Sequence, residues 1–249
     1  MGGRAPAFAL LGPPGTGKSS IGAMAADMIA RATNQEAITC ILDLSCMLPE
    51  DIVGLPYRDG EFTRYAPVDR IHRLCEPNAV GVLVLDDLPA SAPAVQVATR
   101  QIALDRSVGG KRLSDGIAVV VTGNRRQDRS AASTLPAHFR NSVVLLEVAV
   151  QYDAWAEWAA THGVHSSVIG FLGYRPALLS TLPGDADEVG AFATPRTWAM
   201  VGRLAQAGVS GRELHCAAAG LVGQGAALEY RAFRNLLSQI DPRAVLLQP

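Results

Sequence analysis

Charged side chains are scarce in this sequence, and no sign of charge dominates. Only 18% of its 249 residues are charged and 49% are hydrophobic, which is typical of a globular protein with little disorder. The formal net charge of −1 gives no global field that would draw the chain to nucleic acid or to an anionic membrane. We therefore expect its partners to be recognised by local features.

Signals of export, membrane insertion and disulfide or metal chemistry are missing as well. No apolar run approaches the 18 residues that span a bilayer, and the N-terminus has no signal-peptide core. The cysteines show no CxxC pair or metal-ligand spacing, which suits reduced thiols buried in a core. They are Cys40, Cys46, Cys75 and Cys216. The expectation is a soluble, cytoplasmic protein with no membrane partner.

A glycine-rich stretch near the N-terminus is the most specific motif. Gly12, four further residues and then Gly17, Lys18 and Ser19 satisfy the phosphate-loop pattern. Glycines let consecutive backbone N–H groups turn toward a β-phosphate, and the following helix adds its positive dipole end. Lys18 would reach the β- and γ-phosphates, and the Ser19 hydroxyl would ligate magnesium. The predicted nucleotide-binding residues are Gly12, Pro13, Pro14, Gly15, Thr16, Gly17, Lys18, Ser19 and Ser20.

The context of this loop is that of a strand, a turn and a helix. Residues 8–11 form an apolar run that predicts a strand, and residues 20–31 carry apolar side chains at helical spacing. Residues 37–44 predict a second strand. The agreement of these elements makes a chance glycine-rich turn a poor explanation of the motif.

Two acidic residues end the next apolar run. Residues 80–85 read VGVLVL, as expected for a fully buried strand of a parallel sheet, and Asp86 and Asp87 follow directly. Ligands of such sheets lie beyond the carboxyl ends of the strands. Asp86 is predicted to support the magnesium through its water shell, and Asp87 to orient or deprotonate a water.

A further buried strand, residues 117–121, ends at Thr122, Gly123 and Asn124. The amide of Asn124 can hydrogen-bond both a γ-phosphate oxygen and the attacking water. A short helix over 131–141 and a last strand over 143–150 are predicted to follow.

Two segments of this first part leave alternatives open. Residues 47–69, rich in proline and aromatics, predict a hairpin-like excursion that either only connects or has a function of its own. Residues 93–106 predict a helix, and residues 107–116 a small hairpin. Between residues 100 and 129 seven basic residues face three acidic ones. This excess is either a solvated face or a contact for a phosphate-bearing partner or an acidic neighbouring subunit.

From Tyr152 onward the pattern becomes helical. Helical stretches are predicted at residues 154–161, 166–172, 194–207 and 211–237, with an acidic linker at 183–188. Arg196 lies at a helix start, where a cation opposes the helix dipole unless an anion compensates it. We therefore expect a phosphate contact for Arg196.

Taken together, these motifs resemble those of AAA+ ATPases of the MoxR-like clade, close to short ATP-binding proteins of bacteria and their phages. The matching segments are GPPGTGKSS (Walker A), VLVLDDL (Walker B), VTGN (sensor 1), LPAHFRN (arginine finger) and FATPRTW (sensor 2). The resemblance implies an α/β core, residues 1–150, with a parallel sheet, and a small helical lid, residues 151–249. It also implies a homo-oligomeric ring, usually a hexamer, and a protein partner that often carries a von Willebrand A domain.

Two departures from that family pattern affect the chemistry. The Walker B pair is usually Asp-Glu, so Asp87 is one methylene short, and a base misplaced by about an ångström can lose on the order of a hundredfold in rate. The finger arginine usually stands where this chain has Ser142, two residues after Arg140. Either Arg140 reaches the neighbouring site, Arg125 or Arg126 substitutes for it, or the ring hydrolyses poorly.

The sequence thus predicts an ATP hydrolase that binds Mg²⁺ and ATP between subunits and remodels a protein partner, with slow turnover. Its predicted catalytic residues are Lys18, Asp87, Asn124, Arg140 and Arg196, and its predicted metal-binding residues are Ser19 and Asp86. A DNA-associated motor or loader is the alternative that the basic stretch motivates. A small-molecule kinase would leave the sensor-like segments unexplained, and no Asn-Lys-x-Asp segment indicates guanine selectivity.

Overall fold

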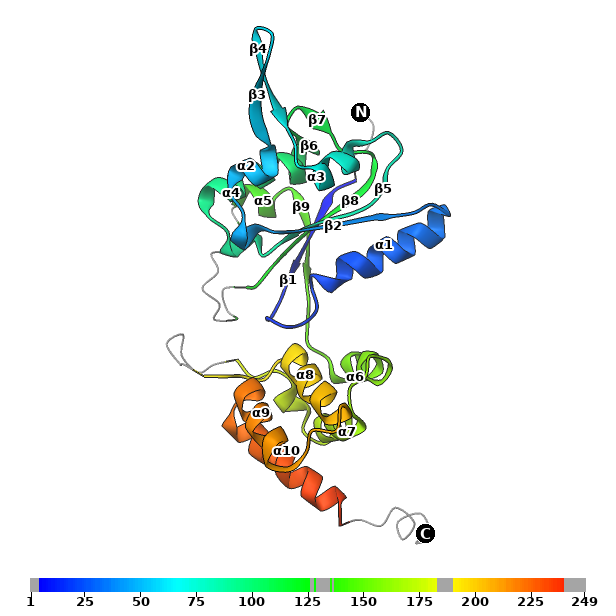
Figure 1. The fold of residues 1–249 in the computed structure, drawn as a ribbon, viewed down its shortest axis with the longest axis vertical. Coiled ribbons are helices and arrows are strands. Elements are labelled where there is room, and N and C mark those ends of the chain that lie inside the picture. Colours follow the sequence, from blue (N-terminus) through cyan, green and yellow to red (C-terminus); the bar gives the residue numbers. More distant parts are fainter. Residues whose placement is uncertain (1–4, 126–127, 129–134, 136, 183–189, 240–249) are drawn as a thin grey trace. The chain divides into compact units, whose positions relative to one another are not determined.

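The computed structural model describes residues 5–125, 128, 135, 137–182 and 190–239. It separates the chain into two compact units. The first unit comprises Met1–Pro13 and Gly17–Val148, and the second comprises Pro14–Thr16 and Ala149–Pro249. Figure 1 shows a sheet-containing first unit and a helical second unit.

The first unit is built on a five-stranded parallel sheet, which confirms the predicted α/β fold. Its strand order is β2-β5-β8-β1-β9, so the strand before the glycine-rich loop lies near the middle of the sheet. The strands are β1 (Ala7–Leu11), β2 (Ile38–Asp43), β5 (Val80–Asp86), β8 (Gly116–Gly123) and β9 (Val143–Glu147). Long β-branched and leucine runs form β5 and β8 because both faces of these strands are buried.

Alternate side chains of the sheet enter two different cores. Val82 and Val84 of β5 pack with Ala26 of α1 (Ser20–Thr33). Leu83 and Leu85 point to the other face, where a larger core includes Val95 of α4 (Pro93–Arg100). The period of two along β5 therefore places one layer of helices on each side of the sheet.

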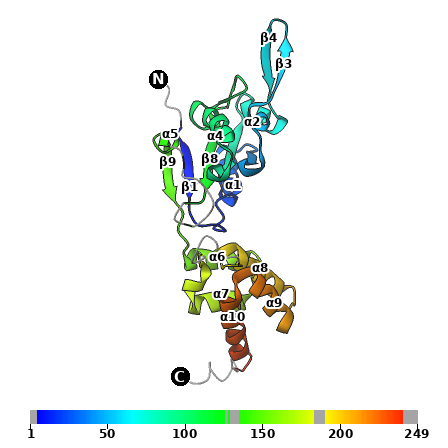
Figure 2. The ribbon, with the colours of Figure 1, turned by 90° about the vertical axis from the view of Figure 1, so that its left-hand side faces the viewer.

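The excursion over residues 47–69 contains a hairpin, as predicted. After α2 (Pro49–Val53), strands β3 (Leu55–Asp59) and β4 (Phe62–Ala66) pair antiparallel, and every residue of both strands is exposed. Figures 1 and 2 show this ribbon projecting from the rest of the first unit. A short helix, α3 (Asp69–His72), leads back to the sheet. The predicted small hairpin is also present, as β6 (Ser107–Val108) and β7 (Lys111–Arg112).

The second unit is a group of helices (Figure 2). Its core includes several large aromatic side chains. The helices are α6 (Tyr152–Thr161), α7 (Ser166–Tyr174), α8 (Pro195–Gln206), α9 (Gly211–Val222) and α10 (Gln224–Leu237). Phe171, Trp198 and Tyr230 contact one another at centroid distances of 5.4 to 5.8 Å. Such offset and edge-on contacts add to the burial of large rings.

The helical segment expected over 93–106 is present, but its last turn differs in type. The α-helix ends at Arg100 and continues as a π-helical turn, Gln101–Asp105, which Arg106 ends with a left-handed φ of 54°. Two other predicted boundaries were wrong. The stretch 211–237 is two helices, because Gly223 between them has a φ of 86°. The last strand ends at Glu147, shortly before the first unit does.

Other expectations are met only in part. The helix expected over 131–141 is described as α5 (Ala137–Arg140), and residues 129–134 and 136 lie outside the described residues, as does the predicted linker at 183–188. Cys46 and Cys216 are exposed, so the expectation of four core thiols was wrong. Among the described residues, the helices are too short or too polar to cross a membrane.

Candidate functional site

The glycine-rich loop leaves the sheet at a position that only glycine can occupy. The Gly12 N–H donates to the Gly123 carbonyl oxygen at 3.3 Å, which ties the loop to the end of β8. A Cβ on Gly12 would lie 2.5 Å from the Val148 carbonyl oxygen. Close backbone packing thus fixes the start of the loop between the ends of β8 and β9.

The end of the loop begins helix α1. Gly17 has a φ of +82°, and its carbonyl oxygen accepts the first helical bond, from the Ser20 N–H at 3.0 Å. Ser19 occupies the N-cap position but makes no side-chain capping bond. Its hydroxyl is therefore available to a ligand, next to the positive end of the α1 dipole.

Lys18 is buried and bound by acceptors of its own unit. Its side-chain ammonium donates to the carbonyl oxygens of Gly12 at 2.9 Å and Pro13 at 2.7 Å, and to Oδ1 of Asn124 at 3.0 Å. The residue is only 7% exposed. The structure therefore brings together the lysine of the loop and the amide at the end of β8, which are 106 positions apart in the sequence.

A threonine that the sequence reasoning did not single out links the two acidic residues. The buried Thr122 hydroxyl donates to Oδ1 of Asp86 and accepts the backbone N–H of Asp87 at 3.2 Å. Asp87 adopts a left-handed conformation, with a φ of 54°. Through these two hydrogen bonds, Thr122 connects both acidic residues to β8.

A third carboxylate ends the neighbouring strand. Asp43 of β2 is aligned with Asp86 in the parallel register. The Oδ1 atom of Asp43 accepts from the Ser45 hydroxyl at 2.6 Å and from the Ser45 N–H at 3.1 Å. The sequence signal was an aspartate at the end of a predicted strand, and it was overlooked because no motif includes it.

Arg125 forms ion pairs within the first unit. Its guanidinium binds both carboxylate oxygens of Asp128, at 3.0 and 2.8 Å, and contacts Glu147 at 3.3 Å. The hydrogen bonds that Arg125 donates to Asp128, which is 3% exposed, raise the pKa of Arg125 above its usual value. These ion pairs connect the residues after β8 with the end of β9, and they do not favour Arg125 as a finger for a neighbour. Arg126 lies outside the described residues.

Two predicted site residues remain, Arg140 and Arg196. Arg140 is the exposed last residue of α5. In the second unit, which includes Pro14, Gly15 and Thr16, the exposed Arg196 begins α8 and its backbone N–H donates to the Gly15 carbonyl oxygen at 3.1 Å. Thr194 caps this helix, accepting from the Thr197 N–H at 3.1 Å.

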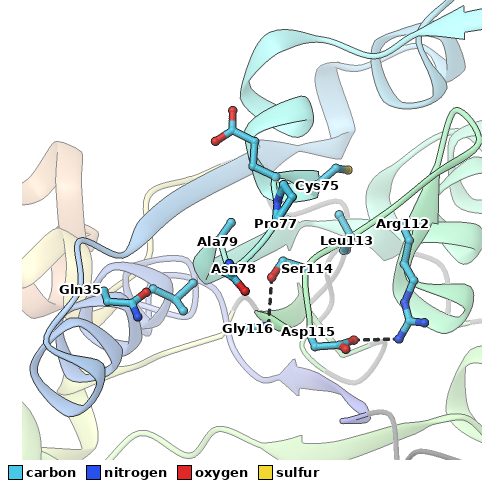
Figure 3. A pocket seen from close by; sticks show the side chains of 12 residues that line it. Gln35, Cys75, Pro77, Asn78, Ala79, Arg112, Leu113, Ser114, Asp115 and Gly116 are labelled. Carbon is cyan, nitrogen blue, oxygen red and sulfur yellow. Dashed lines mark hydrogen bonds and ion pairs between the residues drawn. The ribbon is translucent and has the colours of Figure 1, made fainter.

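A hollow of about 600 Å³ lies at the other end of the sheet, next to the amino ends of β5 and β8 (Figure 3). Its wall includes Asn78 and Ser114, and Arg112 pairs there with Asp115 at 2.8 Å. None of the predicted site residues lines it. The predicted residues Gly12, Asp86 and Asn124 instead stand at the opposite, carboxyl edge, where β1, β5 and β8 end.

Comparison with known proteins gives a fold but no close relative. No protein-family model and no curated protein sequence matches this chain. A RuvB variant from Thermotoga maritima is similar with 14% identity and a TM-score of 0.50, over 94% of this chain and 64% of that one. NtrX from Brucella abortus in complex with ATP is similar with 15% identity and a TM-score of 0.47, over 89% of this chain and 48% of that one. The chain spans less than two thirds of either structure. What the likeness to RuvB shows is the fold: a five-stranded parallel sheet followed by a helical region, as in AAA+ ATPases.

Proposed function

We propose that this chain is an ATPase that binds ATP with residues 12–20 and hydrolyses it at the carboxyl edge of its sheet. The observation that carries the proposal is the position of Lys18. Its ammonium lies between the carbonyl oxygens of the loop and Asn124, where phosphate oxygens of a bound nucleotide would replace those acceptors. A buried lysine with exchangeable partners suits a phosphate ligand better than a purely structural contact.

The residues at the edge fit Mg²⁺ as well. Carboxylate and hydroxyl oxygens are the ligands that this ion prefers, and Ser19 and Asp86 would hold it. Thr122 engages one oxygen of Asp86, which leaves the other for a water of the ion's shell. When bound, Mg²⁺ would neutralise charge on the phosphate oxygens.

Asp87 and Asn124 then have separate tasks. Asp87 accepts a proton from the attacking water, while the Asn124 amide orients it. Because Thr122 holds the backbone of Asp87, the shorter side chain cannot move forward to compensate for the missing methylene. We therefore propose slow turnover.

The finer proposal is a MoxR-like mechanoenzyme that works as a ring. The core, residues 1–150, and the lid, residues 151–249, would bind ATP between neighbouring copies, and the ring would remodel a protein partner such as a von Willebrand A domain protein. Arg140, exposed on α5, is our choice for the finger given to a neighbour, and Arg196 for the contact from the lid.

The alternative is a DNA-associated motor or loader, motivated by the basic stretch 100–129. Two arginines of this stretch are hydrogen-bonded within the chain, which weakens the case for a DNA contact. Arg106 is 3% exposed and donates to the carbonyl oxygens of Ser114 and Ile117, and Arg125 is bound to Asp128. ATPase activity that DNA stimulates with a steep salt dependence would favour the alternative.

The nucleotide site is tested by comparing two lysine variants. Lys18→Ala should abolish binding of Mg–ATP in a calorimetric titration while circular dichroism stays unchanged. The matched control is Lys111→Ala, because the only other lysine is exposed on β7 and bonded to His72. Lys111→Ala should bind ATP as the unmodified protein does. Unchanged affinity of Lys18→Ala would contradict the proposal.

The shared site is tested by complementation. Arg140→Ala should bind ATP normally and lose about a thousandfold in turnover, since a finger given in trans contributes on that order. Mixing it with Lys18→Ala should restore part of the hydrolysis, because each variant keeps the part that the other lacks. Arg31→Ala, which removes an exposed arginine of α1, is the control and should change neither quantity. A rate per subunit that stays flat on dilution of a strictly monomeric sample would rule out the ring.

A further inference from the structure

A cavity in the second unit gathers positive charge. It measures about 280 Å³ and lies between α9 and α10, with Arg212, His215, Arg231 and Arg234 in its wall. No acidic side chain is among the described residues that line it. Like charges collected around one hollow repel one another, and an anion bound there would relieve this repulsion.

The arginines of the cavity have no ion-pair partner among the described residues, although acids are present nearby. Glu229 lies on α10, as Arg231 and Arg234 do, but it pairs with Arg175 of the loop after α7, at 2.9 Å. Arg234, in the last turn of α10, complements the negative end of that helix. Arg212 lies in the first turn of α9, where the helix dipole disfavours a cation. The dipole therefore does not explain why an arginine stands at this position.

Part of the cavity is held in place before any ligand arrives. The Arg234 guanidinium lies over the Tyr230 ring, 6.0 Å from its centroid. Tyr230 is buried, and its hydroxyl lies 2.8 Å from the Ser167 hydroxyl. The ring is thereby a fixed support for the guanidinium, and less side-chain entropy is lost when Arg234 binds an anion.

His215 lines the cavity and carries one unsatisfied ring nitrogen. Its Nδ1 atom is shielded from solvent and has no hydrogen-bond partner among the described residues. Buried polar atoms without a partner are rare, because each costs the free energy of its lost hydration. A turn of the imidazole ring on ligand binding would let a ligand oxygen satisfy this atom.

We propose that the cavity between α9 and α10 binds a phosphate-type dianion. Guanidinium groups match the geometry of phosphate oxygens in pairs, and three of them suit a doubly charged anion better than a single carboxylate. The volume is at the lower end of ligand pockets, which suits one phosphate group. This site is separate from the glycine-rich loop and does not depend on the proposed ATPase activity.

The test is a calorimetric titration of inorganic phosphate into the full chain at constant ionic strength, with chloride as the reference anion. It is done in the Lys18→Ala background, so that the glycine-rich loop does not contribute. Saturable binding is expected there. Arg231→Gln combined with Arg234→Gln should weaken it about ten- to hundredfold, the loss expected for charge-assisted hydrogen bonds. Arg203→Gln, which changes an exposed arginine of α8, should leave it unchanged.

His215 gives a second readout that does not rely on folding of the arginine variants. In the chain with ¹⁵N-labelled histidine, phosphate should shift the Nδ1 resonance of His215 and leave that of the exposed His162 in place. Absence of saturable binding, or binding that all pocket variants retain, would overturn the proposal. The proposal would also be overturned if duplex DNA bound through the same arginines and inorganic phosphate did not displace it.

Discussion

The two units of this chain use their cations in opposite ways. In the sheet-containing unit, Lys18, Arg106 and Arg125 are bound by carbonyl, amide or carboxylate oxygens of the same unit. In the helical unit, Arg212 and Arg231 are exposed beside a cavity and have no such partner among the described residues. A cation that is bound internally contributes to stability, and a ligand that binds it must replace its internal acceptors. A cation without partners contributes little to folding and can serve a ligand alone.

Replacing Arg106 should cause the largest loss in the free energy of unfolding, because its guanidinium is bound internally. Arg106→Met keeps the length of the side chain but leaves the carbonyl oxygens of Ser114 and Ile117 without their donor. Two charge-assisted hydrogen bonds in a buried place suggest a loss of about 3 to 5 kcal/mol in the free energy of unfolding. Urea denaturation followed by circular dichroism measures it. A loss below about 1 kcal/mol would mean that the buried guanidinium is as dispensable as an exposed one.

Asp87 should show an effect on chemistry without one on folding. Asp87→Asn keeps the backbone N–H that Thr122 accepts, but it removes the base, so turnover should fall on the order of a hundredfold or more while ATP affinity stays. Asp87→Glu should raise turnover or leave it unchanged, because it restores the missing methylene. Steady-state ATPase rates and calorimetric affinities separate the two effects. An inactive Asp87→Glu would show that the site is built around the shorter side chain.

Arg231 should show the smallest effect on folding. Arg231→Gln removes an exposed cation that has no ion pair among the described residues, so the free energy of unfolding should change by no more than about 0.5 kcal/mol. The same denaturation experiment as for Arg106 measures it, in a buffer free of phosphate. A loss comparable to that of Arg106→Met would end the contrast between the two units.

Much of the fold could be predicted because its signals are local. The apolar runs that form β5 and β8 and the helical spacing after Ser20 lie in continuous segments, so period and composition were sufficient. The predicted end of a helix was wrong where the backbone conformation of one residue ends the helix. Gly223, with a φ of 86°, divides into two helices a stretch that side-chain pattern alone would continue as one.

By itself the sequence determined the phosphate-loop pattern from Gly12 to Ser19 and the identity of Lys18, Asp86, Asp87 and Asn124, because each belongs to a short motif whose chemistry depends on spacing along the chain. Tertiary structure alone decided what holds them. Thr122 lies 36 positions from Asp86, and only parallel pairing of β5 with β8 brings its hydroxyl to that carboxylate. The arginine cavity likewise exists only because α9 and α10 turn back on each other at Gly223, which places residues distant in sequence around one hollow. A hydrogen bond or a shared cavity depends on distance in space, and the sequence records only distance along the chain.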